Sequence, residues 1–69
     1  MSEQGNFLIF CVEIYRKAKG LSGRQVAELF DRYDVWSYIY DYFESLHTTG
    51  NEYIVWDIDD FIAARQEGV

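Results

Sequence analysis

Cys11 and His47 are the side chains best suited to nucleophilic catalysis, and the chain has only one residue of each type. A nucleophile needs a base within hydrogen-bond reach and a further group that orients the base. Cys11 belongs to the apolar run Phe7–Val12, which predicts a buried and unreactive thiol. His47 follows an expected helix end, where it and Thr48 can hydrogen-bond the turn that ends at Gly50. We therefore expect structural roles for these residues, no catalytic residues and no enzymatic activity.

Paired carboxylates are the second candidate for chemistry, because Asp57, Asp59 and Asp60 lie close together. The Asp-x-Asp spacing is also how an EF-hand calcium loop begins. Such a loop needs Gly at its sixth position and Glu at its twelfth, where this chain has Ile62 and Gly68. The aspartates are better explained as the cap and first turn of a helix, so we expect no metal and no cofactor.

The net charge of −6 is distributed unevenly along the chain. Residues 1–33 carry five Lys and Arg against four Asp and Glu, whereas residues 34–69 carry one against eight. A surface without cations cannot neutralise phosphates, so the second half is unsuited to nucleic acid and suited to a basic partner. A helix-turn-helix over residues 22–46 would present Asp41 and Glu44 to DNA, which makes a DNA-binding regulator the least favoured alternative.

Residues typical of helix starts and ends predict an all-α bundle of three main helices and a short C-terminal helix. Asn6 begins the first helix, and Gly20 ends it after a basic last turn. Ser22 and Gln25 form a capping box at the start of the second helix. The third helix covers residues 35–46, and Asp57 begins the short last one. The β-prone run Tyr53–Val55 is expected to be either a short strand or coil.

Two sets of side chains are candidates for protein contacts. The first helix is apolar nearly all round, which indicates burial on more than one side. Its candidates for self-association are Leu8, Ile9, Val12 and Tyr15. Aromatic residues with polar tips anchor interfaces, and in the second half they alternate with acids. The candidates for binding a partner are Trp36, Tyr40, Asp41, Glu44, Tyr53, Asp57, Asp59 and Asp60.

Length and composition restrict the architecture to one small domain. Residues 6–66 are expected to form it, between a flexible lead-in at residues 1–5 and a tail at residues 67–69. The 49% hydrophobic and 19% aromatic content excludes intrinsic disorder. A 69-residue chain buries only about 60% of its unfolded surface, so a monomer would be marginal. The single Cys, the missing basic leader and the shortness of the apolar run predict a cytoplasmic protein without a membrane contact.

Several segments resemble a short bacterial domain family of unknown function. They are the run Phe7–Glu13, the triplet Leu21-Ser22-Gly23, the motif Leu46-His47-Thr48-x-Gly50 and the motif Asp57-Ile58-Asp59-x-Phe61-Ile62. The resemblance covers residues 6–63, and one departure is Asp34, where Gly is more frequent in the family. Family members are encoded beside larger proteins, among them ADP-ribosyltransferase-like toxin domains.

The resemblance therefore implies an antitoxin or an accessory subunit, and the family offers no catalytic residues to transfer. We expect a non-enzymatic module that binds a larger, basic protein. The alternative is a homodimeric structural domain that self-associates through its first helix.

Overall fold

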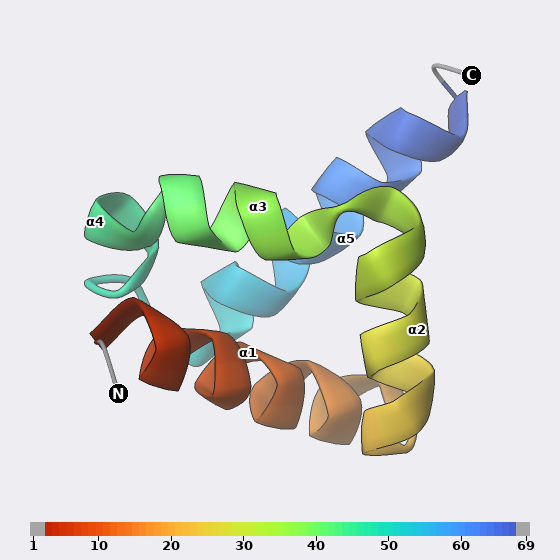
Figure 1. Ribbon diagram of the computed structural model, residues 1–69, viewed down its shortest axis with the longest axis horizontal. Helices are drawn as coiled ribbons and strands as arrows, with labels where there is room; N and C mark the ends of the chain where they lie inside the picture. Colours follow the sequence, from red (N-terminus) through yellow and green to blue (C-terminus); the bar gives the residue numbers. More distant parts are fainter. Residues whose placement is uncertain (1–2, 68–69) are drawn as a thin grey trace.

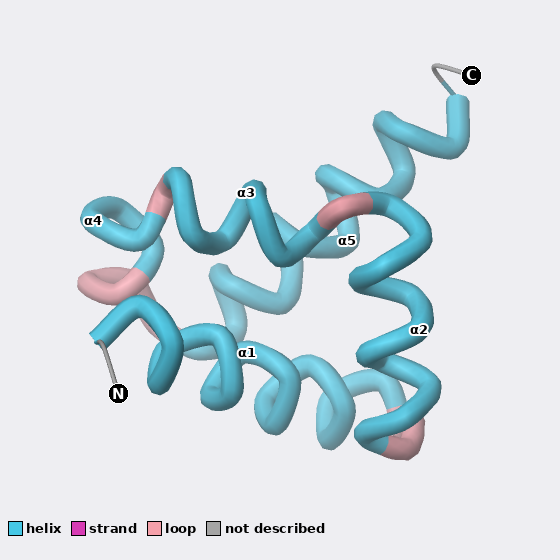
Figure 2. Tube along the Cα trace, viewed as in Figure 1, coloured by secondary structure: helices cyan, strands magenta, loops and turns pink. Residues whose placement is uncertain are grey.

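The computed structural model describes residues 3–67, and all regular secondary structure in that range is helical, which confirms the predicted all-α class. Short loops separate the elements (Figure 2). The helices are α1 (Glu3–Lys19), α2 (Gly23–Tyr33), α3 (Val35–Asp41), α4 (Phe43–Leu46) and α5 (Asn51–Glu67).

Helices α1, α2 and α3 form three sides of a frame, and α5 crosses behind it (Figure 1). Helix α5 contacts both α1 and α3, the two helices on opposite sides of the frame. The molecule measures 32 × 23 × 21 Å. The last helix of the chain therefore closes the fold, because it lies against elements that are far apart in the sequence.

The connection from α1 to α2 follows the local sequence signals. Gly20 has a φ of +68°, and the Leu21 amide donates to the Arg16 carbonyl at 2.9 Å, which is a Schellman ending. At the start of α2, the Gln25 amide donates to the Ser22 hydroxyl at 3.0 Å, and the Ser22 amide donates to the Gln25 side chain at 2.9 Å. The expected capping box is therefore present.

The expected boundaries at the N-terminal end and in the third helix are wrong. Helix α1 begins at Glu3, so residues 3–5 are helical, whereas the sequence predicts a helix that starts at Asn6. Residues 1–2 and 68–69 of the expected lead-in and tail lie outside the described residues. The helix expected over residues 35–46 is interrupted at Tyr42, which has φ −106° and ψ 21°. The interruption redirects the chain into α4, so that the Phe43 ring meets that of Phe7 in α1, edge to face at 5.4 Å between centroids.

The prediction of a short last helix that begins at Asp57 is wrong. Helix α5 has 17 residues and is not short; it includes the run Tyr53–Val55, which is neither strand nor coil. Asp57 lies within α5 and does not cap it. The reason is burial: Ile54, Ile58 and Ile62 follow one another at one-turn intervals and all enter the core. Packing of this stripe outweighs the β propensity of three residues.

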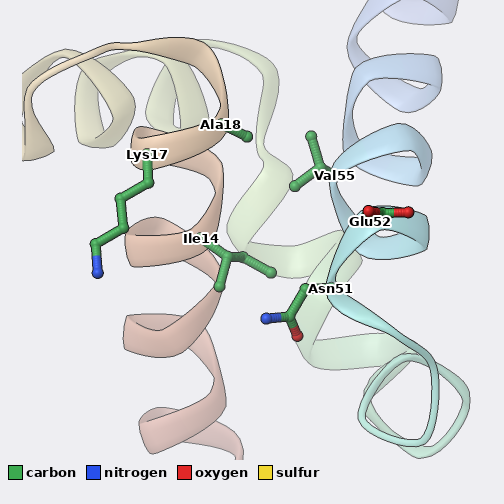
Figure 3. Close-up of a pocket in the computed structure, with 6 residues that line it drawn as sticks. All are labelled: Ile14, Lys17, Ala18, Asn51, Glu52 and Val55. Atoms are coloured by element: carbon green, nitrogen blue, oxygen red, sulfur yellow. The ribbon is translucent and has the colours of Figure 1, made fainter.

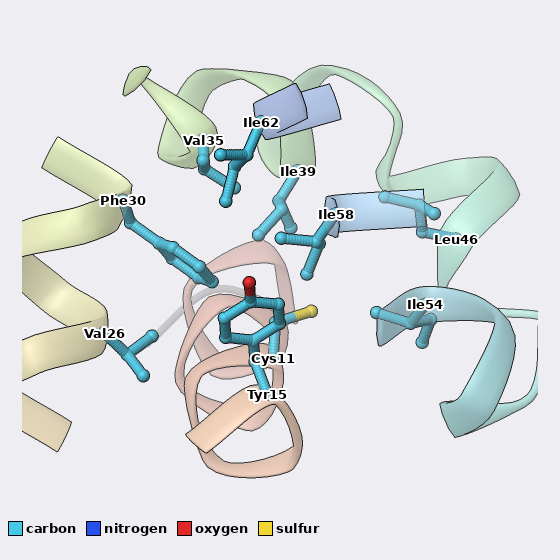
Figure 4. Close-up of a cluster of buried hydrophobic side chains, with 10 residues drawn as sticks. All are labelled: Cys11, Tyr15, Val26, Phe30, Val35, Ile39, Leu46, Ile54, Ile58 and Ile62. Carbon is cyan, nitrogen blue, oxygen red and sulfur yellow. The ribbon is translucent and has the colours of Figure 1, made fainter. Parts of the chain in front are cut away.

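All five helices contribute to one hydrophobic core (Figure 4). Its buried members are Cys11, Tyr15, Val26, Phe30, Val35, Ile39, Leu46, Ile54, Ile58 and Ile62. No charged side chain of the described residues is fully buried. Burial raises the pKa of the Cys11 thiol from 9.0 to about 12, which keeps it protonated and unreactive at neutral pH.

Candidate interaction surfaces

A hydrogen bond between Tyr15 and Asp59 joins α1 to α5. The Tyr15 hydroxyl donates to Oδ1 of Asp59 at 2.6 Å, and Lys19 Nζ lies 2.9 Å from the other carboxylate oxygen. Only 3% of Tyr15 is exposed. Burial, followed by the hydrogen bond to the Asp59 carboxylate, raises the pKa of Tyr15 above its ordinary value. The hydroxyl therefore remains a donor at neutral pH.

A second bond of the same kind joins α3 to the opposite side of α5. The Tyr38 hydroxyl donates to Oδ2 of Asp57 at 2.7 Å, while the Tyr38 ring stacks on Phe61 with centroids 4.2 Å apart. Burial, followed by the hydrogen bond to Asp57, raises the pKa of Tyr38 as well. We call these two contacts the tyrosine–aspartate clamps. They hold α5 between α1 and α3.

The clamps change the interpretation of the acidic cluster. Asp57 and Asp59 are half-buried and already bonded within the molecule, whereas Asp60 is exposed. Their side chains leave α5 in different directions, because Asp57 bonds α3 and Asp59 bonds α1. In residues 3–67, no three His, Cys, Asp or Glu side chains are grouped so that they could hold a metal ion.

Between α3 and α5 lies a surface with aromatic walls and acidic edges. Tyr42 and Tyr53 are each about half exposed, at 54% and 52%. The Tyr42 ring lies 5.0 Å from the Tyr38 ring between centroids, and Tyr53 precedes Asp57, which accepts the Tyr38 hydrogen bond, by one turn of α5. A hollow of about 360 Å³ opens here. Its lining consists of Asp34, Ser37, Tyr38, Asp41, Tyr42, Phe61 and Arg65. We call this hollow together with Tyr53 the α3–α5 face.

The other candidate partner residues do not all join this face. Trp36 is directed toward α2, since its indole N–H donates to Asp31 at 2.6 Å and its ring contacts Phe30. Tyr40 follows Trp36 by one turn and so lies on the same edge of α3, away from Tyr38. Glu44 is exposed on α4. Of the eight candidates, Asp41 and Tyr53 belong to the α3–α5 face, with Asp57 bonded beneath it.

The expected self-association residues of α1 are likewise divided. Tyr15 is buried, and Leu8 and Val12 are partly buried against the core. Ile9 is 55% exposed and lies on the outer side of the helix. Sequence reasoning missed Phe10, which is 42% exposed. Leu8, Val12 and Tyr15 recur at one-turn spacing and share the inner face of α1, whereas Ile9 is turned about 100° away from Leu8.

An apolar groove separates α1 from the first half of α5 (Figure 3). Its volume is about 430 Å³, and its lining consists of Ile14, Lys17, Ala18, Asn51, Glu52 and Val55. Trp56, which is 59% exposed, follows Glu52 by one turn. Sequence reasoning missed both the groove and Trp56, because it placed residues 53–56 outside a helix.

His47 and Thr48 make local contacts at the end of α4. Nδ1 of His47 lies 2.7 Å from the Phe43 carbonyl oxygen, and its ring stacks on that of Phe43. The Thr48 hydroxyl donates to the Ser45 carbonyl at 3.0 Å. The turn ends at Gly50, and Asn51 begins α5. Cys11 is fully buried whereas His47 is exposed, so the thiol and the imidazole do not share a solvent-accessible site.

A family model described as protein of unknown function DUF3791 matches residues 6–65. The chain belongs to this family. The match includes all ten buried residues of the core, so the DUF3791 domain is the whole helical unit described above and not one part of it. No curated protein and no solved structure matches the chain. Among the described residues, none of the helices combines the length and the apolar character needed to cross a bilayer.

Proposed function

We propose that this DUF3791 protein is a non-enzymatic interaction module that binds a larger, basic protein. In this proposal the chain is bacterial and cytoplasmic, and it acts as an antitoxin or accessory subunit for a toxin. The observation that carries the proposal is the α3–α5 face, where half-exposed aromatic rings lie beside exposed carboxylates. Rings of this kind supply buried anchors at an interface, and carboxylates select a basic partner.

The chemistry of the face suits arginine or lysine side chains. Arg65 already places its guanidinium carbon 4.6 Å from the centre of the Phe61 ring, a cation–π geometry. Asp34 and Asp41 are exposed at the edge of the same hollow. A partner cation would meet an aromatic wall and a carboxylate together, a combination that favours a cation over a neutral side chain.

Co-expression with the protein encoded beside this chain, followed by a pull-down, tests the proposal. Tyr42→Ala and Tyr53→Ala should each weaken the complex, by roughly tenfold or more if these rings are anchors. Tyr40→Ala is the matched control, since Tyr40 is 53% exposed but lies on the other edge of α3. The control should bind as the unchanged protein does.

Salt provides a second readout. Replacing Asp41 with Lys reverses one charge of the α3–α5 face, and it should slow association most at low ionic strength. If the neighbouring protein forms no complex, or if the Tyr40 and Tyr42 variants lose binding equally, the proposal is wrong.

A further inference from the structure

The groove between α1 and α5 has an apolar floor that nothing in the described chain covers. Ile14 and Ala18 lie one turn apart on α1, and Val55 lies opposite them on α5 (Figure 3). Ala18 is exposed, and the side chains of Ile14 and Val55 are only partly buried. Apolar surface in this position favours a second layer of helices.

Two large aromatic side chains extend the floor. Phe10 precedes Ile14 by one turn of α1, and Trp56 follows Glu52 by one turn of α5. They are 42% and 59% exposed. The result is a two-helix face with an apolar centre and an aromatic residue on each helix, which is the type of surface that pairs in helical bundles.

The two edges of the groove carry opposite charges, and these charges indicate which kind of partner would fit it. Lys17 lies on the α1 side of the groove and Glu52 on the α5 side (Figure 3). The Lys17 side chain is 70% exposed, and its ion pair with Glu13 is long, at 3.9 Å. Glu52 has no ion-pair partner among residues 3–67. One edge of the groove is thus positive and the other negative.

We infer that a second copy of this chain occupies the groove and forms a two-fold homodimer. A two-fold axis through the groove places α1 of one protomer over α5 of its partner, so each Lys17 meets a Glu52 and each charge is matched twice. The two pairs of helices form a four-helix layer around the apolar floor. A basic partner would instead bring positive charge against Lys17, so charge complementarity favours self-association at this face.

Sedimentation equilibrium of the full chain from about 1 to 300 μM tests the dimer, since that range covers micromolar dissociation constants. Ala18→Glu places a charge on the exposed floor, and it should leave a monomer throughout this range. Ile9→Glu is the matched control, because Ile9 is exposed on the outer side of α1. The control should dimerise as the unchanged chain does. Circular dichroism of each variant shows that the helices remain intact.

A charge exchange tests the two-fold arrangement itself. Lys17→Glu should raise the dimer dissociation constant by roughly tenfold, because two attractive pairs become repulsive. Adding Glu52→Lys should restore it to within about threefold of the original value. A monomeric wild-type chain at the highest concentration, or a dimer that Ala18→Glu leaves intact, overturns the inference. So does a double variant that stays as weak as Lys17→Glu.

The outcome is separable from that of the proposed function, because the groove and the α3–α5 face use different residues. Ala18→Glu should still bind a basic partner through Tyr42 and Tyr53.

Discussion

Replacing Tyr15 with Phe decides whether Asp59 serves the fold or is available to a partner. The substitution removes one hydroxyl and keeps the ring, which packs on Phe30 in the core with centroids 5.5 Å apart. Among residues 3–67, the hydroxyl loses its 2.6 Å hydrogen bond to Asp59. A change in stability therefore reports on that bond.

The expected loss is about 1.5 kcal/mol. Hydrogen bonds to charged groups contribute about 1.5–3 kcal/mol when partly shielded from water, as this one is. The value should lie at the lower end, because Asp59 keeps its ion pair with Lys19 at 2.9 Å and is not left unpaired. The variant buries the same apolar surface, so the dependence of unfolding free energy on denaturant should not change.

Urea denaturation at a fixed protein concentration, followed by circular dichroism, measures this difference. With a slope of about 1 kcal/mol per molar urea for a chain of this size, the midpoint should fall by about 1.5 M. Combining Tyr15→Phe with Asp59→Ala, which removes the acceptor, in a double-mutant cycle should give a coupling energy of about 1 kcal/mol. Tyr40→Phe is the control, because Tyr40 is 53% exposed, and it should change stability by less than about 0.5 kcal/mol.

A coupling energy below about 0.3 kcal/mol would refute the reasoning. The Tyr15–Asp59 hydrogen bond would then not stabilise the fold, and Asp59 would again be a candidate for binding a basic partner.

Three further changes test other parts of the structure. Ser22→Ala removes the observed cap of α2 and should cost about 1 kcal/mol in urea denaturation; an unchanged midpoint would contradict the capping box. Asp34 has a φ of +55° and accepts a bond from Ser37, so Asp34→Ala should cost about 1–2 kcal/mol in thermal unfolding, whereas Asp34→Gly should cost clearly less. The raised pKa values of Tyr15 and Tyr38 predict loss of stability in alkali: above pH ~10 the unfolded chain releases tyrosine protons that the native state retains, so stability falls as pH rises toward the folded pKa. Tyr38→Phe should make this decline shallower, and an equally steep decline would show that Tyr38 does not cause it.

Local signals predicted the connection from α1 to α2 correctly. Gly20, Ser22 and Gln25 determine the backbone geometry around them through bonds to residues at most five positions away. The φ of Asp34 is equally local, since Asp tolerates the left-handed region better than most residues do. These features could be predicted because no distant contact is needed to form them.

The second half could not be predicted in the same way. The run Tyr53–Val55 favours a strand locally, and Asp57 is a good cap, so the start of α5 was misplaced by several residues. The stripe Ile54, Ile58 and Ile62 was the available signal. This stripe favours a helix only when it can pack against the core residues of α1, α2 and α3, which lie far away in the sequence.

Sequence alone therefore determined the helical class, the connection from α1 to α2 and the burial of Cys11. It also determined the acidity of the second half, because charge is a property of composition. Tertiary structure decided which carboxylates are bonded within the molecule. Asp57 and Asp59 accept hydrogen bonds from tyrosines because α5 lies between α3 and α1, whereas Asp60 is exposed. It also brought Ile14 and Val55 to one groove, and Tyr42 and Tyr53 to one face. The physical reason is that a helix presents a different side chain every 100°, so the direction each one takes is settled by the neighbour it packs against.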